Sequence, residues 1–200
     1  SNALTYGLEN PADSFAINLE NRYNGVSFTM NVFDEISYIN FSLFGKFNVY
    51  NCLAAATAAT AIGIEPRCIE KGINSLKCVP GRLEFVEEFN GGYIYIDYAH
   101  TPDGLVNTLK ALKDITKGRL ILLFGCGGNR DSKKRSIMGE IAGEHSDYTI
   151  ITSDNPRFEE PFKIISQIVH KSLLVKFLFI CYNIIVIRKK LFKFIHFSTF

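Results

Sequence analysis

The segment YIYIDYAHTPD, residues 93–103, sets an apolar run directly before a polar loop. The same arrangement recurs in RLILLFGCGGNRD, residues 119–131, and in YTIITSDNPR, residues 148–157. In an open α/β sheet, ligands bind outside the carboxyl ends of the strands. Three polar loops marked by glycine or proline at such places therefore predict one composite polar site.

Strands and helices alternate through this part of the chain, which is typical of βαβ units and a parallel sheet. Thr101 is a suitable N-cap, followed by Pro102 at the first helical position and Asp103 in the first turn. The patterns predict strands over 83–87, 93–97, 119–124 and 148–152, a turn at 90–92, and helices over 102–116, 134–144 and 161–170.

The first third of the chain has a different pattern. Residues 13–41 alternate between apolar and polar side chains, with turn signals at 24–25 and 34–35, so they predict a small antiparallel meander. A helical pattern follows from Asn48 to a C-cap at Gly63, and a second helix is expected over 66–76. The Val79-Pro80-Gly81 stretch marks the expected domain boundary.

Composition indicates a globular, cytoplasmic protein. The hydrophobic content is 47%, which suffices for a core, and the five scattered cysteines read as reduced thiols. Residues 1–3, Ser-Asn-Ala, resemble the remnant of a cleaved tag. Six basic residues and no acidic one lie in 171–200, so the body of the chain is net negative, which argues against a nucleic-acid partner.

Residues 171–200 do not continue the pattern. The apolar run 173–187 is shorter than the roughly twenty residues that a bilayer span needs, so we expect no membrane segment. A core helix or a pair of strands is an alternative. The favoured interpretation is a tail of non-native origin, because its Phe, Ile, Lys, Asn and Tyr bias resembles AT-rich DNA translated in a wrong frame.

The glycine loop and the Asp-Asn-Pro-Arg loop have the chemistry of a charged ligand site. Gly125-x-Gly127-Gly128 lacks the third glycine of a dinucleotide fingerprint, but it lets the backbone pass close to a ligand or to a neighbouring strand. Arg130 is suited to a carboxylate or phosphate, whereas Lys133 and Lys134 fit a solvated basic face. Residues 154–157 either complement a zwitterion or form an ordinary Asx-turn with a surface arginine.

Asp97 and His100 are candidates for acid–base chemistry, but no serine or cysteine nucleophile motif accompanies them. His100 precedes an N-cap and has an equally good structural explanation. No group of residues has the spacing of metal ligands. The residues themselves therefore predict neither a catalytic nucleophile nor a metal site.

Taken in order, these strings resemble the Mur ligase family of ATP-dependent amide-bond-forming enzymes. The resemblance runs from about residue 5 to residue 166 and rests on five motifs, at 45–51, 80–84, 97–103, 125–135 and 154–157. Two positions depart from the family pattern: Phe47 stands where many relatives have His, and Asn129 replaces the usual Asp.

The resemblance implies an α/β chain that ends one domain and begins another. Residues 4–79 would be the C-terminal part of a central ATPase domain, and 80–170 an incomplete Rossmann-like domain with a mainly parallel sheet. By position, the resemblance places Asn51, Arg82, Asp97 and His100 at the nucleotide. It places Arg130, Asp154, Asn155 and Arg157 at the incoming amino acid, which is typically meso-diaminopimelate where the family reads D-N-P-R.

The implied reaction is the ATP- and Mg²⁺-dependent addition of that amino acid to a UDP-muramoyl-dipeptide in peptidoglycan synthesis. The sequence contains no G-x-x-G-K-[ST] phosphate-binding loop, and the family's metal ligands belong to the part upstream. We therefore expect this chain to be an inactive fragment when alone. A non-catalytic amino-acid or nucleotide-binding module and a fragment of a folylpolyglutamate-synthetase-like ligase are the alternatives.

Overall fold

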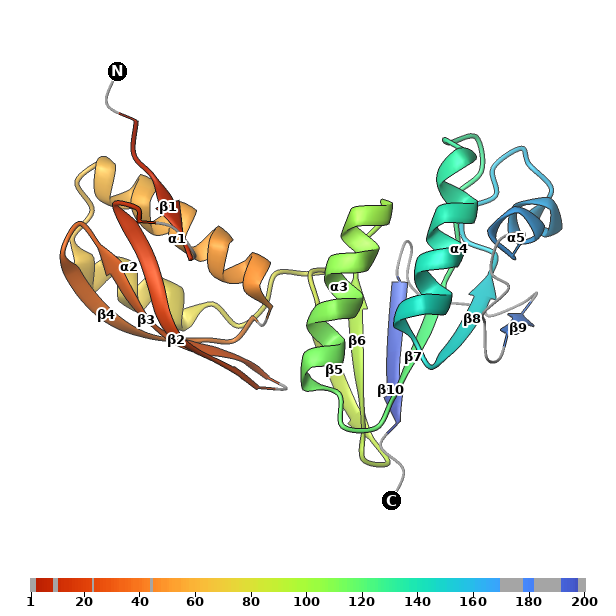
Figure 1. The fold of residues 1–200 in the computed structure, drawn as a ribbon, viewed down its shortest axis with the longest axis horizontal. Coiled ribbons are helices and arrows are strands. Elements are labelled where there is room, and N and C mark those ends of the chain that lie inside the picture. Colours follow the sequence, from red (N-terminus) through yellow and green to blue (C-terminus); the bar gives the residue numbers. More distant parts are fainter. Residues whose placement is uncertain are drawn as a thin grey trace. The chain divides into compact units, whose positions relative to one another are not determined.

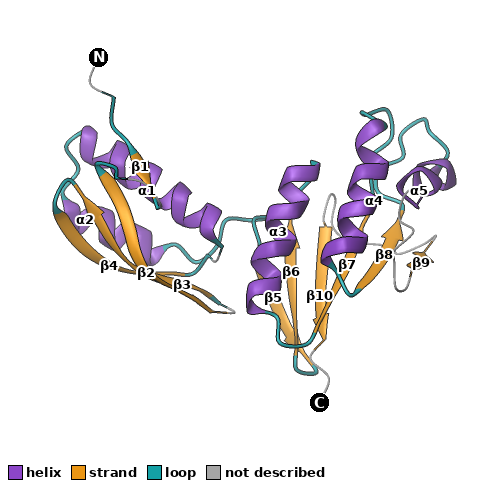
Figure 2. Cartoon of the chain, in the orientation of Figure 1, coloured by secondary structure: helices purple, strands orange, loops and turns teal. Residues whose placement is uncertain are grey.

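The computed structural model describes residues 3–8, 11–22, 24–43, 45–169, 178–181 and 192–197. The chain divides into two compact units, Ser1–Val79 and Pro80–Phe200. Both units combine helices with a sheet (Figure 2). The chain is thus of the α/β class, and each unit is considered separately below.

The sheet of the first unit is a meander, as its alternating sequence predicts. The order is β1-β2-β3-β4, with β1 parallel to β2 and the other pairs antiparallel. Central strand β3 is buried along most of its length, whereas β4 alternates between buried and exposed residues. The strands are β1 (Tyr6–Gly7), β2 (Ser14–Arg22), β3 (Gly25–Val32) and β4 (Glu35–Phe41).

Two helices, α1 (Lys46–Ala61) and α2 (Pro66–Ser75), complete the first unit. Val49, Leu53 and Ala56 of α1 join Phe28 and Ile39 of the sheet in one hydrophobic core. Gly63, just beyond α1, has a φ of 83°, the left-handed conformation that glycine adopts most easily at a helix end. The predicted C-cap glycine is therefore confirmed, although α1 begins two residues before the predicted start.

The second unit follows the predicted alternation of strands and helices, and each predicted boundary lies within two residues of the observed one. Thr101 caps α3 as expected, because its hydroxyl accepts a hydrogen bond of 3.2 Å from the Gly104 amide. The elements are β5 (Glu84–Phe89), β6 (Gly92–Asp97), α3 (Pro102–Ile115), β7 (Arg119–Phe124), α4 (Lys133–His145), β8 (Tyr148–Thr152), α5 (Pro161–Val169), β9 (Leu178–Cys181) and β10 (Phe192–Phe197).

The sheet of the second unit is mixed, and four of its six described strands, β6, β7, β8 and β9, run in one direction. Its order is β5-β6-β10-β7-β8-β9, and only β7–β8 and β8–β9 pair in parallel. The other pairs are antiparallel. Because β10 is antiparallel to both β6 and β7, those two strands still run in the same direction. Strands β6, β7 and β8 therefore direct their carboxyl ends to one edge.

Two segments of the tail, β9 and β10, are strands of this sheet, as the strand alternative for the tail expects. The remaining parts of 171–200 lie outside the described residues, and a non-native origin of the tail stays a prediction. Within the described part of the chain, no helix has the length and apolarity required to cross a membrane.

Helices α3 and α4 lie side by side on one face of the second sheet (Figure 1). Helix α4 also packs against α5, and the two approach closely at Gly139. A Cβ atom at Gly139 would lie 2.0 Å from the Ile168 carbonyl oxygen, so only glycine fits there. This contact fixes the carboxyl-terminal end of α5 against α4.

Candidate functional site

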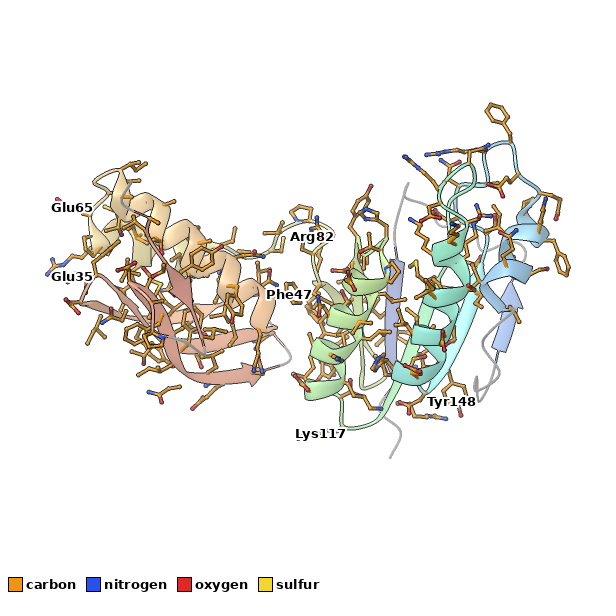
Figure 3. All side chains as sticks on the ribbon, turned by 45° about the horizontal axis from the view of Figure 1, so that its top comes forward. Glu35, Phe47, Glu65, Arg82, Lys117 and Tyr148 are labelled. Atoms are coloured by element: carbon orange, nitrogen blue, oxygen red, sulfur yellow. The ribbon has the colours of Figure 1, made fainter. Side chains whose placement is uncertain are left out.

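The three polar loops predicted from the sequence leave the same edge of the second sheet. They follow β6, β7 and β8, which run in one direction. Arg82 lies at the edge of the sheet from which the loops leave. Lys117, just before β7, and Tyr148, the first residue of β8, lie at the opposite edge (Figure 3). The carboxyl ends of the strands thus gather the loops, as the α/β pattern predicts.

The loops after β7 and β8 are bonded to each other at several points. The Gly128 amide donates to the Asn155 carbonyl over 2.8 Å. The Phe158 amide donates to Oδ1 of Asn129 over 3.1 Å. Nη1 of Arg157 donates to the Gly128 carbonyl over 3.1 Å. Residues 125–130 and 153–159 therefore form one structural element, which we call the double loop.

Glycine is required inside the double loop because the two backbones touch. A Cβ atom at Gly125 would lie 2.4 Å from the Thr152 carbonyl oxygen, and one at Gly128 would lie 1.8 Å from the Pro156 carbonyl oxygen. Neither residue has a positive φ, so the requirement is space rather than backbone conformation. The prediction that these glycines allow a close approach is confirmed, and the neighbour is another backbone.

The four residues expected to hold an amino acid all lie on the double loop and are exposed. A Cβ atom at Gly127 would lie 3.9 Å from Oδ2 of Asp154 and 4.0 Å from Cγ of Arg130, so both side chains border this glycine. Among the described residues, the side chains of Arg130, Asp154 and Asn155 have no hydrogen-bond partner. Their charges and amide are available to a ligand.

Arg157 differs from the other three because the protein holds part of its guanidinium. Nη1 contacts the carbonyl oxygens of Gly128 and Asn129, at 3.1 and 3.4 Å. Its own φ of 52° lies in the left-handed region, which is unusual for a residue with a side chain. The side chain is thereby turned back over the glycine loop, and its Nε and Nη2 have no partner in the described structure.

The sequence interpretation missed an ion pair between a buried arginine and the half-buried Glu159 at the end of the double loop. Arg135 of α4 is 1% exposed, and its two Nη atoms donate to the two carboxylate oxygens of Glu159 over 2.8 and 2.9 Å. Arg135 was hidden within a run of cations. Its helical spacing to Met138 and Ala142, which are buried, is the signal that could have found it.

Arg82, Tyr98 and His100 form an exposed cluster at the loop after β6. The Arg82 guanidinium lies over the Tyr98 ring at 5.9 Å, and the Tyr98 and His100 rings meet edge to face at 5.3 Å. Nδ1 of His100 is 3.1 Å from the Tyr98 carbonyl oxygen. The structure thus brings together Arg82 and His100, two of the residues expected at a nucleotide, with an aromatic ring between them.

Asp97, a third residue of that set, is buried beneath the cluster and bonded within the protein. Its Oδ2 accepts from the Leu83 amide over 2.8 Å, and its Oδ1 accepts from the Ala99 amide and the Thr108 hydroxyl over 2.8 and 3.1 Å. A carboxylate has about four acceptor positions, so three are occupied. Asp97 therefore fixes the loops around Arg82 and His100, and its contact with a nucleotide stays a prediction.

Replacing Asp97 by alanine is expected to lower the free energy of unfolding of the second unit by at least about 2 kcal/mol, because buried donors lose their acceptor. Urea unfolding of the chain measures the loss. Asp103→Ala is the matched control, since this exposed acid in the first turn of α3 contributes only about 0.3–1 kcal/mol through the helix dipole. Equal losses for both variants would contradict the structural role of Asp97.

One side chain links the His100 loop to helix α4. Nζ of Lys134, at the start of α4, donates to the His100 carbonyl over 2.8 Å. Lys134 is therefore not simply a solvated cation, as its sequence context suggested.

Asn51, the remaining residue expected at a nucleotide, belongs to the first unit. It is exposed on α1, and its side-chain amide lies 3.4 Å from Oδ1 of Asn48.

Two of the cysteines are buried and unreactive. Burial raises the pKa of the Cys52 thiol to about 12 and that of the Cys126 thiol to about 11, so both stay protonated at neutral pH. Within the described residues, no group of three or more His, Cys, Asp or Glu side chains is arranged to hold a metal ion.

Comparison with known proteins identifies the family. Residues 81–190 match the family described as "Mur ligase, glutamate ligase domain", and residues 1–59 match "Mur ligase middle domain". The chain belongs to the Mur ligase family. The family resemblance read from the five motifs is thus confirmed, and the double loop and the Arg82–His100 cluster both lie in the glutamate ligase domain.

The similar curated proteins are named UDP-N-acetylmuramoyl-L-alanyl-D-glutamate–2,6-diaminopimelate ligases. That of Caldanaerobacter subterraneus subsp. tengcongensis is 46% identical over 165 residues, 82% of this chain and 34% of the relative. That of Clostridium acetobutylicum is 46% identical over 171 residues, 83% of this chain and 35% of the relative. The chain thus spans about a third of the length of these relatives.

Solved structures agree with this assignment. A diaminopimelate ligase of the same name matches with a TM-score of 0.60 at 31% identity, covering 90% of this chain and 37% of that one. The folylpolyglutamate synthase of Mycobacterium tuberculosis matches with a TM-score of 0.68 at 16% identity, covering 86% of this chain and 38% of that one. The second likeness concerns the fold alone.

Proposed function

We propose that this chain is the amino-acid-recognising part of a ligase that adds meso-diaminopimelate to UDP-N-acetylmuramoyl-L-alanyl-D-glutamate. The observation that carries the proposal is the double loop, which presents Arg130, Asp154 and Asn155 exposed and without partners and holds Arg157 over the glycines. The names of the curated relatives supply the substrate class.

The charges of the double loop complement those of diaminopimelate. An amino acid with an additional carboxylate needs an acceptor for its ammonium groups, which Asp154 supplies, and cationic donors for its carboxylates. Arg130 and Arg157 supply planar guanidinium groups that can bind a carboxylate through two parallel hydrogen bonds. Asn155 adds an amide that both donates and accepts. Lysine lacks the distal carboxylate and would leave one guanidinium unpaired.

In the whole enzyme, ATP would activate the carboxylate of the UDP-muramoyl-dipeptide, and the amine of diaminopimelate would then form the amide. Arg82 and His100, with Asn51 of the first unit and the positioning carboxylate Asp97, are our candidates for the nucleotide side. The described residues offer no cluster suited to Mg²⁺. We therefore assign the metal that the family uses to the part of the enzyme outside this chain and derive no step through it.

The proposal includes the domain assignment and the setting of the reaction. Residues 4–79 would end the central ATP-binding domain, and residues 80–170 would begin the amino-acid-binding domain. The enzyme would act in the cytoplasm on a UDP-linked precursor of peptidoglycan, with neither nucleic acid nor membrane as a partner. By itself, this chain would bind ligands without turning over ATP.

The binding of meso-diaminopimelate to this chain tests the proposal. NMR titration of the ¹⁵N-labelled chain is expected to shift the amides of 127–130 and 154–157, with a dissociation constant of about 1 mM, or about −4 kcal/mol. L-lysine should bind at least tenfold more weakly, because a site built for a polar group rejects an analogue that leaves it unpaired. Equal shifts with lysine, or shifts confined to other residues, would contradict the assignment.

A further inference from the structure

A single buried side chain, that of Arg135, donates hydrogen bonds to both halves of the double loop. Arg135 projects from the first turn of α4, is 1% exposed, and reaches three other segments. It donates to Glu159 at the end of the double loop, to the Gly127 carbonyl over 3.1 Å, and to Oε1 of Gln167 on α5 over 2.6 Å. Few other positions could tie α4, both halves of the double loop and α5 together.

Glu159 connects Arg135 to the ligand-facing residues through further hydrogen bonds. Besides Arg135, its carboxylate accepts a short hydrogen bond from the Asn129 amide. Asn129 in turn accepts from the Phe158 amide, and its carbonyl accepts from Arg157. The chain of bonds therefore runs from buried Arg135 through Glu159 and Asn129 to the Arg157 guanidinium.

We propose that the Arg135–Glu159 pair is a positioning element that holds the double loop in the geometry that selects the amino acid. The proposal rests on the proposed function for its ligand, but the pair itself touches no substrate group. Arg130 and Arg157 make the recognition contacts, and the pair determines where those contacts lie. The loss of either partner should therefore weaken amino-acid binding without removing any group that binds it.

The charged groups around Glu159 keep the pair ionised. The hydrogen bonds from Arg135 are the main cause, followed by the Asn129 amide and the charges of Arg135 and Lys163, and together they lower the pKa of Glu159 from 4.5 to about 2. A carboxyl group whose pKa is lowered on folding stabilises the fold above its unfolded pKa. This contribution is lost as the pH falls from about 4.5 towards 2, so the pair is intact at neutral pH.

Three variants of this chain test the positioning role: Arg135→Met, Glu159→Gln and Arg135→Lys, which keeps the charge but not the paired geometry. The first two are each expected to raise the dissociation constant for meso-diaminopimelate about tenfold. They should also speed hydrogen exchange at the Asn129 and Phe158 amides, a readout that needs no ligand. Arg135→Lys should give a smaller effect on both. Lys133, an exposed cation two residues before Arg135, provides the matched control, and Lys133→Met should change neither.

A double variant separates positioning from general stability. Because the two residues bind each other, the effects of Arg135→Met and Glu159→Gln should overlap, and the double variant should weaken binding by less than the product of the two single effects. The pair has no positioning role if the folded variants bind diaminopimelate within twofold of the unsubstituted chain, or if the exchange of Asn129 and Phe158 is unchanged. If the unsubstituted chain binds lysine equally well, the proposed function fails instead, and the exchange measurements still decide the role of the pair.

Discussion

Replacing Gly128 by alanine is expected to separate the two halves of the double loop and to reduce the affinity for meso-diaminopimelate about 10²-fold. The added methyl group would lie 1.8 Å from the Pro156 carbonyl oxygen, and that atom belongs to backbone rather than to a flexible side chain. The loops must therefore move apart by more than an ångström. A misplacement of about 1 Å in an active site can cost about 10²-fold in reaction rate, and we expect a loss of similar size in the affinity here.

The same change should lower the free energy of unfolding by about 1–3 kcal/mol, the usual cost of overfilling a packed region. Gly127→Ala is the matched control for stability, because its methyl group would meet no atom closer than 3.7 Å, the Asn155 carbonyl oxygen. Urea unfolding and NMR titration measure the two effects. If Gly128→Ala kept the stability and the affinity of the unsubstituted chain, the close contact between the two loops would be wrong.

The placement of the site follows from the sequence because its signals are local. A strand that ends in a polar string can be recognised from alternation and turn residues alone, and β8 has the boundaries predicted for it, Tyr148–Thr152. The start of α3 was equally clear, since Thr101, Pro102 and Asp103 are each favoured at a helix start for a different physical reason. Parallel orientation then brings the loops to one edge.

The interior of the site could not be predicted because its bonds join residues far apart in sequence. Glu159 gives no local sign that it binds Arg135, and a run of three cations, residues 133–135, suggests a solvated surface rather than a buried guanidinium. The hydrogen bonds of Asp97 and Arg157 within the protein could not be predicted either. The sequence does not show whether a carboxylate or a guanidinium binds a ligand or the backbone. The antiparallel position of β10 between β6 and β7 could not be predicted either, because β10 pairs with strands that are far from it in the sequence.

The double contact of Arg157 leads to the most specific prediction about selectivity. In a full-length ligase that carries the same two loops, Arg157→Ala should reduce kcat/KM for meso-diaminopimelate by at least tenfold, or about 1.4 kcal/mol. The free Nε and Nη2 would bind the distal carboxylate, while Nη1 stays on the carbonyl oxygens of Gly128 and Asn129. Steady-state kinetics with each substrate varied in turn measures the change.

The choice of comparison decides what a loss at Arg157 means. Loosening of the loop alone would lower kcat/KM for diaminopimelate and for lysine together, because the two amino acids share the α-amino and α-carboxylate groups. Loss of a contact to the distal carboxylate weakens diaminopimelate only, so the ratio of the two kcat/KM values should fall by the same tenfold or more. The KM for ATP should stay unchanged, because the Arg82–His100 cluster is built on another loop. A change in that KM, or equal use of lysine before the substitution, would show that Arg157 does not read the distal carboxylate.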